Sequence, residues 1–100
     1  MKIKISVLTY ESLKVYDIDE ETQTFTINGQ KIDTNIRNAL FFINQICSNW
    51  PDNLENNTYD GLIVKIVISA DNHKKIFHFK NKFPEDFVLL MQFLNEVENV

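Results

Sequence analysis

The chain has little of the material from which catalytic and cofactor sites are usually built. Its 100 residues include two glycines, two histidines and one cysteine. Two glycines are too few for a glycine-rich loop that cradles phosphate, and a single cysteine excludes a disulfide framework. The histidines, His73 and His78, lack a recognised zinc spacing, and no serine stands in a G-x-S-x-G context. We therefore expect a protein that is not an enzyme and that holds no metal and no cofactor.

Long apolar runs are also missing. No segment approaches the roughly 18 apolar residues of a membrane-spanning helix. The first residues alternate between apolar and polar instead of forming the apolar run of a signal peptide. The hydrophobic content is nevertheless 44%, which is typical of a folded protein, and the net charge is −4. These features predict a cytoplasmic protein without a membrane partner, folded as a single domain of residues 1–100.

The sequence predicts about five strands, residues 2–9, 13–18, 23–27, 62–70 and 76–80. Residues 2–9 alternate between apolar and polar, as a half-buried strand does. The fourth segment is apolar on both sides, which favours a central position in the sheet. Asn28-Gly29 and Asp71-Asn72 predict tight turns, because these residue types tolerate positive φ.

Two further segments have apolar residues at helical spacing. The first runs from Ile36 to Trp50, with Asp33 or Thr34 available as its N-cap. The second begins at Pro84, which fits the first turn of a helix. The predicted order is β-β-β-α-β-β-α. This order is typical of a two-layer α+β sandwich in which a mainly antiparallel sheet carries both helices on one face. Cys47 lies in the apolar stripe of the first helix, which predicts a buried thiol rather than a reactive one.

The chain also contains a candidate internal repeat. Seven positions recur at a constant offset of 51 residues: Ile36, Leu40, Phe42, Ile43, Asn44, Gln45 and Ile46 match Phe87, Met91, Phe93, Leu94, Asn95, Glu96 and Val97. The strand residues Phe25-Thr26-Ile27 and Phe77-His78-Phe79 precede the two copies. This predicts two related ββα units, residues 1–50 and 51–100. Chance similarity between amphipathic helices stays open, because one residue must be inserted to align the strands.

Alternation assigns one side of the sheet to the helices and the other to solvent. The candidate binding residues on the solvent side are Lys2, Lys4, Lys14, Tyr16, Lys65, His78 and Lys80, next to Thr24, Thr26, Ile63 and Val67. A basic and apolar face on an acidic protein favours an anionic partner, although an ordinary solvated sheet face is the alternative. Nucleic acid is not expected, because only Tyr16 is available for stacking on bases. Residues 13–18 are the weakest point, since a slip of one residue exchanges the two faces.

Two smaller surfaces are further candidates. Phe41 and Leu89 fall on the outer sides of the two helices and together predict an apolar patch for a partner or a second copy. The candidate acidic turn comprises Asp17, Asp19, Glu20 and Glu21. It begins like a calcium loop, but Thr22 stands where the loop needs glycine, so a solvated turn is favoured. The same acids would mimic phosphate if the partner were a nuclease.

The leading interpretation is a small protein-binding module of the immunity, inhibitor or antagonist type. The alternatives are a small domain that binds an anionic ligand on its lysine-rich sheet face, and a structural homodimer. Twelve Asn, twelve Ile and nine Lys against one Arg indicate AT-rich codons, and hence a low-GC bacterium or one of its phages. The expected partner is thus a protein or a second copy of the chain.

Overall fold

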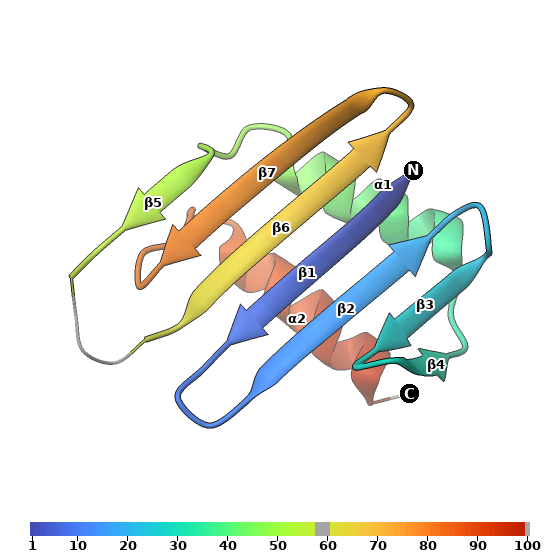
Figure 1. Cartoon of the computed structure of the whole chain (residues 1–100), viewed down its shortest axis with the longest axis horizontal. Coiled ribbons are helices and arrows are strands. Elements are labelled where there is room, and N and C mark those ends of the chain that lie inside the picture. The colour runs from blue at the N-terminus through green and yellow to red at the C-terminus, as the bar shows by residue number, and fades with distance from the viewer. Residues whose placement is uncertain (58–60, 100) are drawn as a thin grey trace.

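The structure is a computed structural model that describes residues 1–57 and 61–99, and it has a seven-stranded sheet at its centre (Figure 1). The elements in chain order are β1 (Lys2–Leu8), β2 (Leu13–Asp19), β3 (Thr24–Ile27), β4 (Gln30–Ile32), α1 (Ile36–Cys47), β5 (Asn53–Glu55), β6 (Ile63–Ala70), β7 (His73–Lys80) and α2 (Phe87–Glu98). The spatial order is β4-β3-β2-β1-β6-β7-β5, and within the described residues only the β5–β7 pair is parallel. Both helices lie on one face of the sheet, which confirms the predicted α+β class (Figure 1).

The two edge strands were not predicted, so the sheet is larger than expected. β4 follows the Asn28-Gly29 turn directly, because Ile27 pairs with Gln30 across it. Asn28 and Gly29 have φ of 50° and 81°, the positive values that this turn requires. β5 lies in the segment 52–61 that was predicted as a loop, of which residues 58–60 lie outside the described part of the chain. Each edge strand has three residues, too few to show a periodic pattern.

The first helix is shorter than predicted and has a different cap. Its N-cap is Asn35, whose side-chain oxygen accepts a hydrogen bond from the Asn38 backbone N–H at 3.0 Å. The prediction of Asp33 or Thr34 as the cap is therefore wrong. The helix ends at Cys47. The Ser48 N–H then donates to the Gln45 carbonyl three residues earlier, which forms a tighter turn than the α-helix.

The second helix lies beside the first and runs in roughly the opposite direction (Figure 1). It begins at Phe87, so Pro84 lies in the turn before it, where the Pro84 carbonyl accepts the Phe87 N–H at 3.0 Å. The Phe42 and Phe93 rings meet between the helices with centroids 4.8 Å apart. Neither helix of the described residues is long and apolar enough to cross a membrane.

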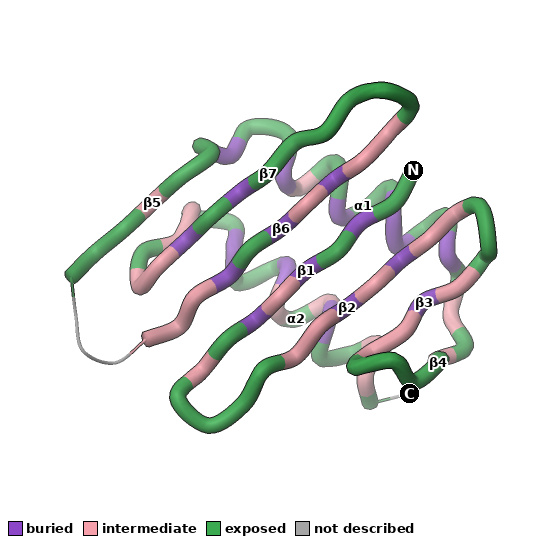
Figure 2. The backbone as a smooth tube through the Cα atoms, viewed as in Figure 1, coloured by how far each residue is buried: buried purple, intermediate pink, exposed green. Residues whose placement is uncertain are grey.

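The core lies between the sheet and the helices. Along β1, β6 and the second half of β7, buried residues alternate with residues that reach solvent (Figure 2). Near the β7 edge, Trp50 packs against Phe77, Phe79 and Phe87, with ring centroids 5.7–6.3 Å apart. Aromatic pairs of this kind contribute about 0.5–1.5 kcal/mol each beyond their buried area. This cluster therefore anchors the segment that leaves α1.

β2 presents the opposite face from the one predicted. Tyr16 pairs with Ile5 and is 3% exposed, and Ile18 is fully buried. Lys14 and Tyr16 therefore belong to the helix side of the sheet, and their assignment to the solvent side is wrong. The physical reason is the neighbouring carboxylate, since the predicted register would turn Asp17 into the apolar core without a partner.

The two halves share a hairpin geometry at the centre of the sheet. Ile5 lies opposite Tyr16 in the first hairpin, and Ile66 lies opposite Phe77 in the second. Both members of the second pair lie 61 positions after those of the first. By register, the counterpart of β7 in the first half is thus β2 rather than β3. The β3–β4 hairpin is then an additional segment of the first half. A duplication of the chain itself stays a prediction.

The β2 register can be tested by substitutions at adjacent positions. Tyr16→Ala removes a buried ring and is expected to lower the free energy of unfolding by about 3 kcal/mol. Asp17→Ala changes an outward side chain and is expected to alter it by less than about 0.5 kcal/mol. Urea unfolding followed by the fluorescence of Trp50 measures both. A larger loss for Asp17→Ala would contradict the register.

Candidate functional site

The open face of the sheet is the broadest candidate site, because neither helix covers it (Figures 1 and 2). The registers of β1, β6 and β7 place five lysines on this face, namely Lys2, Lys4, Lys65, Lys74 and Lys80, and Lys31 of the edge strand β4 lies on the same face. Their neighbours on the adjacent strands include His78, which lies opposite Lys65 and is exposed. Five of the predicted sheet-face residues are thus on one surface, and Lys74 joins them.

Four of these lysines surround a hollow of about 410 Å³. It is lined by Lys2, Lys4, Lys65 and Lys74, together with Ser6, Val67 and Ser69. All seven residues come from the adjacent strands β1, β6 and β7, so the side chains alone form its walls. The arrangement concentrates positive charge on one face of a protein whose net charge is −4.

Most of this charge has no carboxylate partner. Lys2 Nζ lies 3.9 Å from Asp19 Oδ2, and Lys80 Nζ lies 3.9 Å from Glu55 Oε1. Within the described part of the chain, Lys4, Lys65 and Lys74 form no ion pair. Neighbouring like charges without counter-ions create a local positive potential that attracts anions.

The predicted acidic turn borders this face rather than standing apart from it. Asp17 and Asp19 lie in β2, where the register sets them opposite Lys4 and Lys2. Only Glu20 and Glu21 belong to the turn itself. Glu20 Oε1 lies 3.0 Å from the amino-terminal nitrogen, so that carboxylate already has a cationic partner. The lysine-rich part of the open face is thus bordered by the acidic residues of β2.

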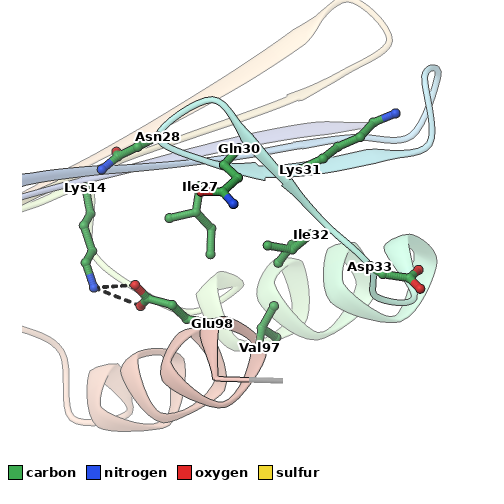
Figure 3. Close-up of a pocket in the computed structure, with 9 residues that line it drawn as sticks. All are labelled: Lys14, Ile27, Asn28, Gln30, Lys31, Ile32, Asp33, Val97 and Glu98. Atoms are coloured by element: carbon green, nitrogen blue, oxygen red, sulfur yellow. Dashed lines mark hydrogen bonds and ion pairs between the residues drawn. The ribbon is translucent and has the colours of Figure 1, made fainter.

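Lys14 lies on the other side of the sheet, in a separate hollow of about 650 Å³ between the end of α2 and the β3–β4 hairpin (Figure 3). Its Nζ donates to both carboxylate oxygens of Glu98, at 2.7 and 2.9 Å. The hydrogen bond to Glu98 raises the pKa of Lys14, and burial raises the pKa of Tyr16 nearby. Lys14 and Glu98 therefore satisfy each other's charge, and the other charged residues that line this hollow are Lys31 and Asp33.

Phe41 lies on α1 and Leu89 lies on α2. Both are exposed, at 69% and 45%. Phe41 lines a hollow with Met1 and Arg37. Leu89 lies one helical turn before Phe93, whose ring meets that of Phe42 on α1. A joint apolar patch of Phe41 and Leu89 stays a prediction.

The remaining reactive groups form no cluster. Cys47 is 1% exposed, and burial raises the pKa of its thiol to about 12. No group of three or more His, Cys, Asp or Glu side chains among the described residues is arranged to hold a metal ion. The chain matches no protein-family model, no curated protein and no solved structure.

Lys74 is the site residue that the sequence analysis missed. The fifth strand was predicted to begin at residue 76, whereas Ala70 pairs with His73 directly across the Asp71-Asn72 turn. A two-residue turn requires the next strand to begin at once. Applied strictly, this rule would have placed Lys74 in the strand and on the lysine-rich face.

The buried thiol predicts a loss of stability at alkaline pH. The pKa of Cys47 rises from 9.0 in an exposed thiol to about 12 in the folded protein, so folding favours the protonated form. This contribution is fully present below pH 9.0 and is lost as the pH rises towards 12. The raised pKa values of Lys14 and Tyr16 act in the same direction above their ordinary values.

Urea midpoints measured over this pH range test the effect, with Cys47→Ala as the control. The variant is expected to be less stable at neutral pH, because it leaves a cavity, but to lose less stability between pH 9 and 12. Identical slopes for the two proteins would contradict a buried neutral thiol.

Proposed function

We propose that this chain is a non-enzymatic protein-binding module, and that its open sheet face receives an acidic surface of the partner. The observation that carries the proposal is the hollow lined by four lysines, three of which have no ion pair within the described residues. An uncovered sheet face of this charge, on a chain of net charge −4, is selective for a partner with complementary charge.

The apolar residues of this face favour a protein over a small anion. Val67 lines the hollow between the lysines, and Ile76 lies opposite it on β7 with 45% exposure. Protein interfaces combine apolar contacts at the centre with charged residues around them. A small anion would instead use a few convergent polar groups in an enclosed pocket, whereas three adjacent strands line this hollow from one side.

The same face is poorly suited to nucleic acid. Single-stranded nucleic acids stack their bases on exposed aromatic side chains. Tyr16, the one aromatic residue predicted for this role, is 3% exposed on the helix side. A module of the inhibitor, immunity or antagonist type requires only that such a face occupy the partner's surface, and it needs no catalytic group.

Charge reversal on the face tests the proposal. The probe is a short fluorescein-labelled peptide of alternating glutamate and valine, and binding is followed by fluorescence anisotropy at low salt. The double variant Lys4→Glu, Lys65→Glu is expected to weaken binding by at least about tenfold, which corresponds to about 1.4 kcal/mol.

The matched control is the double variant Arg37→Glu, Lys82→Glu. It changes the net charge by the same amount at exposed positions outside the sheet, one on α1 and one after β7, so binding should stay within about twofold. Equal losses in both variants would show that net charge alone matters and would refute the face. Stabilisation by inorganic phosphate without any binding of the peptide would favour the small-anion alternative instead.

A further inference from the structure

β7 has one long edge that the rest of the sheet does not cover. β7 has eight residues, whereas β5 pairs with it only from His78 to Lys80. The His78 N–H donates to the Asp52 carbonyl at 2.8 Å, and the Lys80 carbonyl accepts the Asn56 N–H at 2.9 Å. The backbone groups of these even-numbered residues therefore point away from β6.

The same alternation directs the N–H and C=O groups of Lys74 and Ile76 towards the edge. Among the described residues, none pairs with them there. The corresponding edge of β2, beyond the end of β3, is covered by Asn28. The Val15 N–H donates to Asn28 Oδ1 at 2.7 Å, and the Asn28 N–H donates to the Val15 carbonyl at 2.8 Å. Exposed strand edges of this kind are templates for an added strand.

We propose that the partner supplies an acidic extended segment that pairs as an additional strand with β7 at residues 73–77, in line with β5. This inference rests on the proposed function and specifies how the partner binds. Lys74 points to the open face, where it lines the lysine-rich hollow. Lys75 points to the helix side, with its Nζ 5.0 Å from the centre of the Phe77 ring. An added strand would therefore meet a lysine on each of its two faces.

The charge of this edge selects an acidic segment over a second copy of the chain. His73, Lys74 and Lys75 are consecutive and exposed. Two copies joined along this edge would bring two such runs side by side, and like charges on paired strands are destabilising. Carboxylates at alternate positions of a partner strand would instead share the open face with Lys74, where Ile76 offers an exposed apolar contact. Added strands obtain affinity from main-chain hydrogen bonds and specificity from alternate side chains.

A single proline tests the strand pairing. Ile76→Pro removes an N–H that points to the edge and leaves the bonds to β6 in place, as edge strands tolerate. The control Ile76→Thr also removes the apolar side chain but keeps the N–H. We expect Ile76→Pro to weaken binding of the glutamate–valine peptide by about tenfold relative to Ile76→Thr, because a hydrogen bond is lost and the ring obstructs the approach. Urea unfolding of both variants verifies that each is folded.

A second measurement keeps the protein unchanged. Two versions of the peptide are made, one with N-methyl groups on the odd-numbered residues and one with them on the even-numbered residues. Each version retains the charge of the peptide but loses half of its backbone N–H donors. At least one version should bind about tenfold more weakly if the peptide forms a strand.

The strand pairing would be overturned if both methylated peptides bound as tightly as the unmethylated peptide and if the two Ile76 variants bound it equally well. If binding were still lost in Lys4→Glu, Lys65→Glu, the open face would remain the binding site, so this failure is distinguishable from failure of the proposed function. No binding of the peptide to the wild-type protein would overturn both proposals.

Discussion

The antiparallel pairing of β1 with β6 is the constraint on which the rest of the structure depends. It sets Ile5 opposite Ile66 at the centre of the sheet and joins the two hairpins into one surface. Because side chains alternate along a strand, the register that buries these isoleucines also turns Lys4 and Lys65 to the open side. A slip of one residue would bury lysines and expose the core. The apolar core and the lysine-rich face are therefore two consequences of one register.

The lysine-rich face is compatible with a stable fold because water weakens the repulsion between its charges. Two unit charges about 6 Å apart in water repel by about 0.7 kcal/mol, which is small beside the roughly 5–15 kcal/mol that stabilises a domain. On the β2 side, Asp17 and Asp19 limit the repulsion further. In the proposed complex, a carboxylate of the partner would remove the repulsion that remains.

The sequence predicts an element correctly where the pattern of that element's own residues determines which of its faces is buried. The strong alternation in β1 predicts its two faces and the side on which the helices lie, and the apolar residues on both sides of β6 predict its place inside the sheet. β2 has no such contrast, because Lys14 shares its buried side with Tyr16 and Ile18. The charge of Lys14 is compensated by Glu98, a residue 84 positions away, and no local pattern reveals such a partner. The edge strands are missed for a related reason, since three residues pair through tertiary contacts rather than through a pattern of their own.

The open edge of β7 follows from the aromatic packing at the end of α1. Trp50 is 7% exposed and is held against the Phe77 and Phe79 rings. Asp52 follows two residues later, and its carbonyl already bonds to His78. The chain therefore reaches β7 near its carboxyl-terminal end, and β5 can run only forward from that point. Lengthening β5 backwards along residues 73–77 would require Trp50 to leave the core, and loss of a buried Trp or Phe ring costs about 3–5 kcal/mol. The packing that secures the core thus prevents β5 from extending along residues 73–77.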